Sequence, residues 1–320
     1  MNSFRYFNLS VIFYMVLFVC NGILAQNSVS VGIVDFDYSP IKTQMEKNSS
    51  ALLTSINTAY SNKTKPVKIA GMTDYAYSTL LQIWEVSTFR CLEMDIIERA
   101  IITPKGGYEI RNIPVYITEA SKNDENHDIV LVFNSNGVIE DLYNALPKMV
   151  YNRLLQEGED VKDIRLRQIV LDFIENFRTS YNRRDINYLE KVYSDDAVII
   201  TGQVIKTAQV DGRSSLPKEE IRYNKQTKAQ YLSKMKTIFN SVSYININFA
   251  DIEIVRHTKF DNIYGVSLNQ DWNTTGYSDK GYLFLVIDFT NEDNPLIDVR
   301  TWSPNNPNAK KYKLSDFKIN

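Results

Sequence analysis

Apolar residues recur every three to four positions in several stretches of the chain, and this spacing predicts amphipathic helices. The most regular stripe combines Ile169, Val170, Phe173, Ile174, Phe177 and Tyr181. Polar residues that suit helix starts, such as Thr73 and Asp185, precede several of these stretches. The helices predicted in this way are Ile41–Tyr60, Thr73–Glu85, Lys148–Gln156, Ile164–Asn182, Ile186–Tyr193 and Lys228–Phe239.

Elsewhere apolar and polar residues alternate, which predicts strands. The strands of the first half are Asp95–Ile102, Tyr108–Thr118 and two within Ile129–Leu142, with Val29–Val34 as an edge strand or an extended leader. Those of the second half are Ala197–Thr201, Tyr244–Arg256, Asn262–Thr274, Gly281–Thr290 and Leu296–Trp302. Residues 203–227 are polar without a clear period, so they are predicted to form a long surface loop.

Each half therefore places helices before a run of antiparallel strands, which is an α+β order with helices packed on one face of a curved sheet. Short similarities between the halves, such as Asn57–Asn62 and Arg178–Asn182, suggest that the N-terminal domain is a divergent copy of the C-terminal one. An unrelated α+β domain is the alternative. The predicted organisation is a signal peptide at 1–25, an N-terminal domain at 26–147, a connecting helix or linker at 148–162, and a C-terminal domain at 163–320.

The N-terminus predicts export. Arg5 precedes an apolar run from Leu9 to Val19, and a small-residue end at Ala25 follows, as in a secretory signal peptide. The run is shorter than the roughly 20 residues that a membrane-spanning helix needs. A lipid anchor at Cys20 is the less favoured alternative, because Phe18-Val19 lacks the small residue that such cleavage requires. The protein is expected in the periplasm, at the outer membrane or outside the cell.

Composition narrows the function classes. The chain has 320 residues and a formal net charge of −2, which gives no basic field for nucleic acid. Twenty tyrosines suit the walls of a cavity or a binding face, although a compositional habit explains them as well. Without the signal peptide, Cys91 is the only cysteine, so no internal disulfide forms and this thiol is expected to be buried. His127 and His257 are the only histidines and lack metal-ligand spacing, so we predict neither metal nor cofactor.

Residues 163–304 carry a recognisable set of motifs. Tyr181-Asn182 and Asp185 lie at a helix turn, the segment YSDDA (Tyr193–Ala197) precedes the first strand, and a final strand pair ends at Trp302. This segment resembles the nuclear transport factor 2-like superfamily, also called SnoaL-like or ketosteroid-isomerase-like. The resemblance implies a cone in which a curved antiparallel sheet wraps over three helices, with a pocket at one end. It also implies a homodimer through the open sheet face. The domain arrangement is similar to that of uncharacterised secreted proteins of the Bacteroidetes.

Ketosteroid isomerase provides a test of the enzyme hypothesis. Its chemistry needs a carboxylate base, and an oxyanion hole made by a tyrosine and a protonated acid. In this chain the corresponding positions fall on Thr201, Phe177 and Leu285. None of these side chains can perform the role, so that isomerisation is not expected and no catalytic residue is assigned.

The candidate pocket residues are polar or aromatic side chains on the main helix and the last three predicted strands. They are Tyr181, Asn269, Asp271, Trp272, Tyr282, Asp288, Asp298, Arg300 and Trp302. Asp298, Arg300 and Trp302 alternate along one strand and are expected to share a face. On the concave side they would bind a polar ligand that carries a ring; on the convex side they would be a solvent-exposed charge pair. Asp251 and Glu253 are expected to point outward.

The sequence therefore predicts an exported binding or protein-association module without catalytic activity, whose ligand is unknown. Two alternatives remain open. One is a lyase or isomerase that uses Asp271 or Asp288 as base together with Tyr282. The other is a structural subunit of an envelope assembly, which would expose a large apolar patch.

Overall fold

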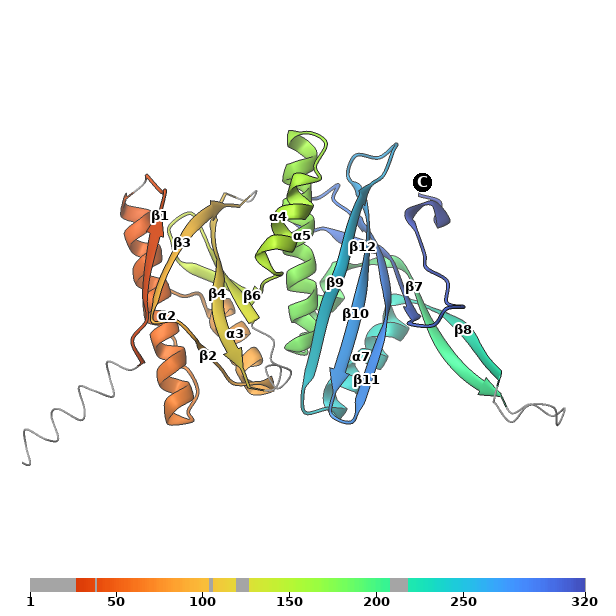
Figure 1. The fold of residues 1–320 in the computed structure, drawn as a ribbon, viewed down its shortest axis with the longest axis horizontal. Helices are drawn as coiled ribbons and strands as arrows, with labels where there is room; N and C mark the ends of the chain where they lie inside the picture. The colour runs from red at the N-terminus through yellow and green to blue at the C-terminus, as the bar shows by residue number, and fades with distance from the viewer. Residues whose placement is uncertain (1–26, 38, 104–105, 119–126, 208–217, 320) are drawn as a thin grey trace, which may run out of the picture. The chain divides into compact units, whose positions relative to one another are not determined.

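The computed structural model describes residues 27–37, 39–103, 106–118, 127–207 and 218–319. The chain divides into two compact units, Met1–Leu142 and Tyr143–Asn320 (Figure 1). This division falls slightly before the predicted boundary at residue 147 and places the helix at 148–156 in the second unit. The predicted signal peptide and Cys20 lie outside the described residues. Within the described ranges, no helix is both long and apolar enough to cross a membrane.

The first unit packs two helices against a six-stranded sheet. Its helices are α2 (Ser39–Asn62) and α3 (Asp74–Val86), and its strands are β1 (Ser30–Val34), β2 (Phe89–Cys91), β3 (Asp95–Ile102), β4 (Tyr108–Ile117), β5 (His127–Phe133) and β6 (Ile139–Asn144). The strand order is β1-β3-β4-β5-β6, and β2 also pairs with β4. Because β1 pairs with β3 in parallel, the sheet is mixed rather than purely antiparallel.

Cys91 lies in the core of the first unit, as the sequence predicted. Its thiol contacts the backbone oxygen of Glu93 at 3.3 Å, and burial raises the pKa of the thiol. A buried thiol of this kind is a poor nucleophile.

The second unit packs its helices against another six-stranded sheet. Its helices are α4 (Lys148–Gln156), α5 (Val161–Asn182), α6 (Ile186–Val192) and α7 (Lys228–Ser241). Its strands are β7 (Tyr193–Thr207), β8 (Lys218–Gln226), β9 (Ile245–Arg256), β10 (Ile263–Thr274), β11 (Tyr277–Asp288) and β12 (Leu296–Pro304). The strand order is β8-β7-β12-β11-β10-β9, with β12 and β7 parallel. The predicted α+β cone, with a sheet wrapped over α5, α6 and α7, is confirmed, although this sheet too is mixed.

Local sequence signals explain where the helices of the second unit begin. Asp160 caps α5 by accepting a hydrogen bond from the backbone of Asp163, and Asp185 caps α6 in the same way. Arg184 has a φ of 58°, which makes the tight turn between these two helices. Thr227 and Gln230 form a capping box at the start of α7. These caps fix the ends of the helices that surround the site described below.

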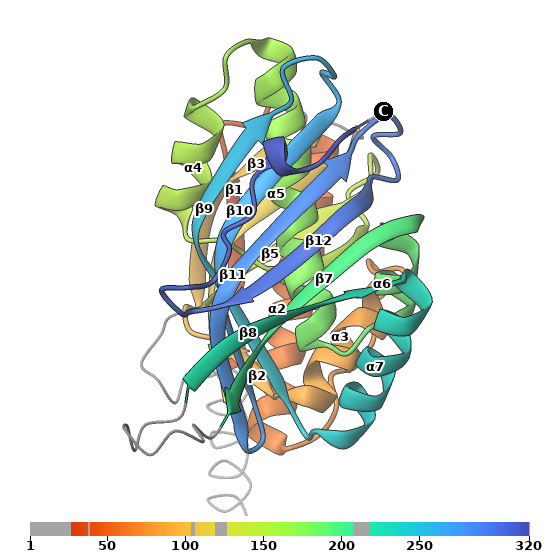
Figure 2. The same ribbon diagram turned by 90° about the vertical axis from the view of Figure 1, so that its right-hand side faces the viewer.

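The sheet of the second unit has two different faces. The inner face packs on α5, α6 and α7 and forms the main core, which includes Phe177 and Leu285. On the outer face, a smaller cluster joins four strands to the chain's end through Ile263, Phe284, Val286, Val299 and Val198. Residues 305–319, here called the strap, cross this outer face and contain only a short 3-10 turn at Leu314–Asp316 (Figure 2).

The prediction of a surface loop at 203–227 was wrong for most of its length. Strand β7 continues to Thr207, and Lys218–Gln226 form β8, which pairs with β7 as far as residues 207 and 218. Most side chains along β8 are exposed, so the strand has no buried face and shows no apolar alternation. The β-branched and aromatic residues Val204, Ile205, Ile221 and Tyr223 were the available signal.

Side chains cover the free edge of β9. Arg153 donates to the Ile252 backbone oxygen and Arg167 to that of Ile254, each at 3.3 Å. Farther along, the Asn182 side chain accepts from the Ile247 backbone nitrogen at 2.7 Å. Asn182 was part of the motif on which the family resemblance rested, and in the structure it joins the end of α5 to the edge of the sheet.

The two units share a long helix, a shorter helix and a mixed sheet. In the described residues, however, the first unit has no helix between its strands that corresponds to α7. The divergent-copy hypothesis for the N-terminal unit therefore stays a prediction.

Candidate functional site

Aromatic side chains line the inside of the cone. They come from α5, β7, α7 and β10 and are Phe173, Phe177, Tyr181, Tyr193, Tyr231, Phe239 and Trp272. Tyr181 lies at the centre of this group, with its ring edge-on to Phe177 at 5.1 Å and to Trp272 at 5.8 Å between ring centroids. The stripe of α5 that predicted a helix therefore also forms one wall of the cone.

Three of these aromatics form a hydrogen-bonded tyrosine hub, Tyr181, Tyr193 and Tyr231. The Tyr181 hydroxyl lies 2.7 Å from that of Tyr231 and 3.1 Å from that of Tyr193. Burial raises the pKa of Tyr181 and of Tyr193 well above the usual value for a phenol. Both therefore remain neutral at physiological pH, and a neutral phenol can still donate a hydrogen bond to an acceptor.

A buried cation adjoins the tyrosine hub. Arg300 on β12 is only 5% exposed, and its guanidinium lies 4.9 Å from the centre of the Tyr231 ring. Burial alone would lower the pKa of Arg300, but the phenol oxygens of Tyr231, Tyr181 and Tyr193 hold the pKa above its ordinary value. No carboxylate of the described residues lies within 4.0 Å of this guanidinium, and its Nε has no hydrogen-bond partner among them. The site is thus a permanently charged cation that lacks a counter-ion among the residues that the structure describes.

Two more buried polar atoms without partners lie in the same part of the sheet. They are the indole Nε1 of Trp302 and the Oε1 of Gln226. Ile199 of β7 pairs with Arg300 of β12 on one side and with Gln226 of β8 on the other. Two positions farther along β12, Trp302 pairs with Thr201 of β7. Side chains two positions apart on a strand share a face, so all three point to the inner side. Arg300 and Trp302 thus present two unused N–H donors on one face.

Because Gly281 is a glycine, the Trp302 ring can pack close to its backbone. A Cβ at Gly281 would lie 2.7 Å from the Trp302 ring and 2.3 Å from the Ser303 backbone oxygen. We expect Gly281→Ala to lower the free energy of unfolding by about 1–3 kcal/mol, because the ring and the strand must both move. Urea denaturation measures this difference. Gly32→Ala is the control, since its Cβ meets only one atom, at 4.0 Å, and an equal loss in both variants would contradict the explanation.

The structure brings together four of the predicted pocket residues and separates the others. Tyr181, Trp272, Arg300 and Trp302 lie on the inner side. The prediction that the remaining residues share this pocket was wrong for Asn269, Asp271, Tyr282 and Asp288, which alternate onto the outer side of β10 and β11.

Asp298 also departs from its prediction. The sequence interpretation assumed that Asp298 shares a face with Arg300, but a β-bulge between Ile297 and Val299 interrupts the alternation at this point. Burial raises the pKa of the Asp298 carboxyl, which contacts Ser194.

Sequence reasoning missed Tyr193, Tyr231 and Gln226. Tyr193 stood inside the YSDDA motif and Tyr231 on the apolar stripe of a predicted helix, so both were read as elements of the fold. Gln226 fell in the segment predicted as a loop. Nothing in the sequence pattern showed that Tyr193 and Tyr231 lie close to Arg300, or that Gln226 faces the same side of the sheet.

The three positions that the resemblance assigns to ketosteroid isomerase catalysis differ in burial. Phe177 and Leu285 are fully buried in the core of the cone, and Thr201 is half-buried beside Trp302. These side chains bring no ionisable group to the interior. Asp163, which is fully buried like Glu175 on the same helix, is already bonded to Tyr264 and Arg167.

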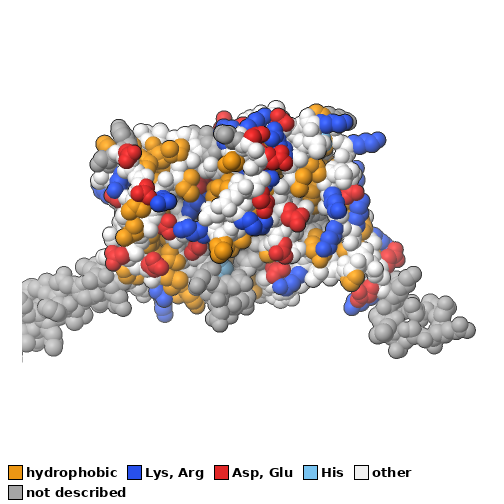
Figure 3. All heavy atoms as spheres, turned by 45° about the horizontal axis from the view of Figure 1, so that its top comes forward, with side chains coloured by type: hydrophobic (Ala, Val, Ile, Leu, Met, Phe, Trp, Pro, Cys, Tyr) orange, Lys and Arg blue, Asp and Glu red, His pale blue; other side chains and the backbone are white. Residues whose placement is uncertain are grey.

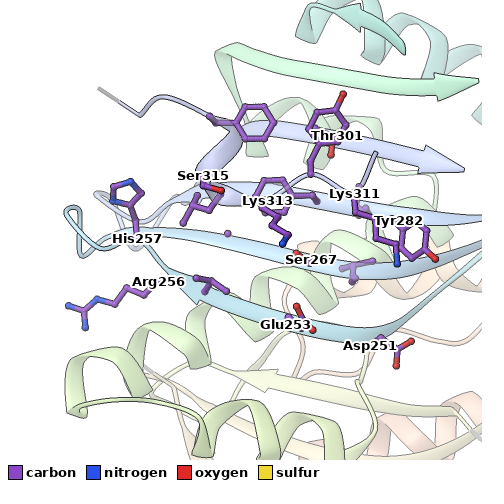
Figure 4. Close-up of a pocket in the computed structure, with 18 of the residues that line it drawn as sticks. Asp251, Glu253, Arg256, His257, Ser267, Tyr282, Thr301, Lys311, Lys313 and Ser315 are labelled. Carbon is purple, nitrogen blue, oxygen red and sulfur yellow. The ribbon is translucent and has the colours of Figure 1, made fainter. Parts of the chain in front are cut away.

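The outer face has a groove of about 800 Å³ between the sheet and the strap (Figure 4). Asp251 and Glu253 of β9 form one side, and Lys311 and Lys313 of the strap form the other. The ammonium of Lys311 lies 3.8 Å from the centre of the Tyr282 ring. The groove thus mixes both charge signs, and Figure 3 likewise shows acidic and basic side chains interspersed over the visible face of the molecule.

The described part of the chain contains no group of three or more His, Cys, Asp or Glu side chains that could hold a metal ion. The His257 ring accepts hydrogen bonds from the backbone nitrogens of Lys259 and Phe260 at 3.1 Å, so this histidine fixes the turn after β9.

Comparisons with known proteins give the fold a context. No family model and no curated protein matches the chain. Among solved structures, the chain is similar to a nuclear transport factor 2-like protein from Cytophaga hutchinsonii, with 14% identity over 43% of this chain and 97% of that one and a TM-score of 0.32.

Two further similar structures are described as proposed enzymes. One is a proposed dehydratase of the same family from Streptomyces avermitilis (14% identity, 44% and 96% coverage, TM-score 0.32). The other is a proposed scytalone dehydratase from Novosphingobium aromaticivorans (8% identity, 48% and 91% coverage, TM-score 0.33). At such identities and TM-scores these likenesses carry no argument, and the second unit is described by its own architecture, a six-stranded sheet wrapped over three helices.

Proposed function

We propose that the second unit binds a small anionic ligand between Arg300, the tyrosine hub and Trp302, without catalysing a reaction. The observation that carries this proposal is the buried guanidinium of Arg300, which has no carboxylate partner among the described residues. Buried charges in proteins are normally paired. A carboxylate or a similar anion can accept hydrogen bonds from the unfilled donors at Arg300 Nε and Trp302 Nε1.

The unpartnered Nε favours a missing anion over a purely structural role for Arg300. The effective cost of burying an ion in a protein is several kcal/mol. A desolvated cation–π contact such as that with Tyr231 returns about 2 kcal/mol, and a hydrogen bond from a charged donor about 1.5–3 kcal/mol. These contacts are of the same order as the cost, but they leave Nε unsatisfied. A ligand anion would supply the acceptor that Nε lacks, and the surrounding rings suit a ligand that also carries a ring.

A binding role is favoured over lyase or isomerase chemistry because, in the described parts of the chain, the groups that interact with Arg300 are tyrosines and not carboxylates. The acids proposed from sequence, Asp271 and Asp288, are on the outer side of the sheet, and Asp271 is paired with Lys280 at 2.6 Å. Tyr282, their proposed partner, bonds to Asn305 on that same side. Together with the predicted signal peptide, this suggests an exported receptor or carrier of small anions.

The test is a thermal-shift titration of the purified protein with nitrate, formate and benzoate, using benzamide as a neutral analogue at equal ionic strength. We expect the anions, but not benzamide, to raise the melting temperature. Arg300→Met should remove about 2–5 kcal/mol of anion binding free energy while leaving stability unchanged or increased. Arg222→Met, at an exposed arginine of β8, should retain full binding.

Two results would overturn the proposal. The first is an equal response to benzoate and benzamide, which would mean that charge is not recognised. The second is an Arg300→Met variant that loses stability but keeps the response to anions, which would make Arg300 a structural residue of the tyrosine hub.

A further inference from the structure

One buried acceptor on the inner side of the second unit's sheet is left over by the binding of an anion. The Oε1 atom of Gln226 on β8 is buried, and no described residue donates a hydrogen bond to it. Gln226 faces the same side as Arg300, because both pair with Ile199 of β7, which lies between them. An ionised carboxylate only accepts hydrogen bonds, so it would leave Gln226 without a partner.

Arg300 and Gln226 are too far apart to contact one group of a ligand. Neighbouring strands lie about 4.8 Å apart, and β7 separates β12 from β8, so the two backbones are about 10 Å apart. The side chains stand roughly perpendicular to the sheet and keep much of this separation. Two hydrogen bonds of about 2.9 Å each, made by one carboxylate, do not span it. A ligand that contacts both residues therefore needs a second polar group at a distance from its acid group.

Burial decreases from Arg300 towards β8. Arg300 is 5% exposed, and Gln226 and Thr201 are half-buried. Asn224, the cross-strand partner of Thr201, is exposed. These four side chains share the inner face of β12, β7 and β8, which lie side by side (Figure 2). A ligand held here would have its acid group innermost and its second polar group towards β8.

We propose that the ligand of the second unit is an organic acid that also carries a hydroxyl or N–H donor, and that Gln226 selects it by accepting a hydrogen bond from that donor. This inference rests on the proposed function, in which Arg300 and Trp302 bind the acid group. A ligand without a donor would leave the buried Oε1 atom unpaired and away from water, which disfavours its binding. Gln226 is thus a specificity-determining residue, whereas Arg300 recognises charge.

The test is isothermal titration of the purified protein with matched pairs of ring acids. The pairs are 3-hydroxybenzoate with 3-methoxybenzoate and 4-hydroxybenzoate with 4-methoxybenzoate, and benzoate is the reference. Methylation removes the donor but keeps the acid group and the ring oxygen substituent. The parent chain should bind at least one hydroxy acid about ten-fold more tightly than its methoxy partner, as expected for one added hydrogen bond.

Three variants separate the hydrogen bond from the extra size of the methyl group. Gln226→Met removes the acceptor at similar volume, so the preference for the hydroxy acid should vanish while benzoate binds as before. Gln226→Glu keeps an acceptor and should retain the preference, although its charge weakens the binding of every acid. Lys225→Met, whose side chain takes the opposite face of β8, is the matched control and should behave as the parent does.

The outcomes distinguish this inference from the proposed function. Binding of benzoate that depends on Arg300 but shows no preference within either pair would overturn the role of Gln226 alone. A preference that persists in Gln226→Met would also overturn it, since the methyl group would then be its cause. Failure of every acid to bind would overturn both proposals. Each preference is a ratio measured within one variant, so a change in stability does not alter it.

Discussion

Asp163→Ala will lower the free energy of unfolding by about 3–5 kcal/mol, the range measured when one partner of a buried ion pair is removed. Asp163 is completely buried and accepts hydrogen bonds from Tyr264 at 2.5 Å, Arg167 at 2.9 Å and the Glu159 backbone at 3.0 Å. Its loss leaves the Arg167 guanidinium, only 6% exposed, without its closest counter-ion. Urea or thermal denaturation provides the measurement.

The control for this prediction is an exposed acid that is also paired. Asp195 contacts Lys228 at 2.9 Å, but its side chain is 98% exposed, so Asp195→Ala should cost no more than about 1 kcal/mol. Similar losses in the two variants would contradict the special role of Asp163.

The same carboxylate makes stability depend on pH. Burial alone would raise the pKa of Asp163, but its three hydrogen-bond donors outweigh burial and hold the pKa below the ordinary value of 3.8. The unfolded chain therefore takes up this proton first as the pH falls. The stabilisation from Asp163 is complete above about pH 5 and is lost between about pH 4 and the lower pKa of the folded state. Denaturation of Asp163→Asn across this range should show a shallower dependence on pH than the parent chain.

Phe177→Ala is expected to cost about 3–5 kcal/mol of unfolding free energy, as for other fully buried phenylalanines. The Phe177 ring stacks on Phe173 at 6.2 Å and meets Tyr181 and Tyr193 edge-on, so truncation leaves a cavity beneath the tyrosine hub. Phe260→Ala serves as the control, since this ring is 41% exposed and should cost less than about 1 kcal/mol. A Phe177 variant as stable as the Phe260 variant would mean that the cone interior is not close-packed.

Residue periodicity predicted the helices and most strands well because each of them buries one side. The stripe from Ile169 to Tyr181 lies in the core as expected, and Asp185 caps α6. Strand β8 was missed because its side chains are mostly exposed, so it lacks the period that reveals a half-buried strand. The parallel pairing of β7 with β12 was missed for another reason: pairing direction depends on the path of the chain, which no local pattern records.

The candidate site was predicted only in part because grouping residues by strand ignores which side each one takes. Trp272 and Asp271 are neighbours in sequence, yet one contacts Tyr181 inside the cone and the other contacts Lys280 outside. Alternation alone would have separated these two residues. It would not have revealed the bulge at Asp298, nor the meeting of Tyr193 and Tyr231 with Arg300, since these three residues are far apart in the chain.

The covered edge of β9 has a consequence for how this protein behaves at high concentration. An open strand edge is a template on which other chains can add strands and build fibrils. Along β9 the backbone oxygens of Ile252 and Ile254 are already used by arginines from α4 and α5, and the Ile247 nitrogen by Asn182. The opposite edge, β8, carries exposed charges such as Glu220 and Lys225. Cross-β growth from this sheet is therefore blocked by occupied hydrogen bonds on one side and by charge on the other.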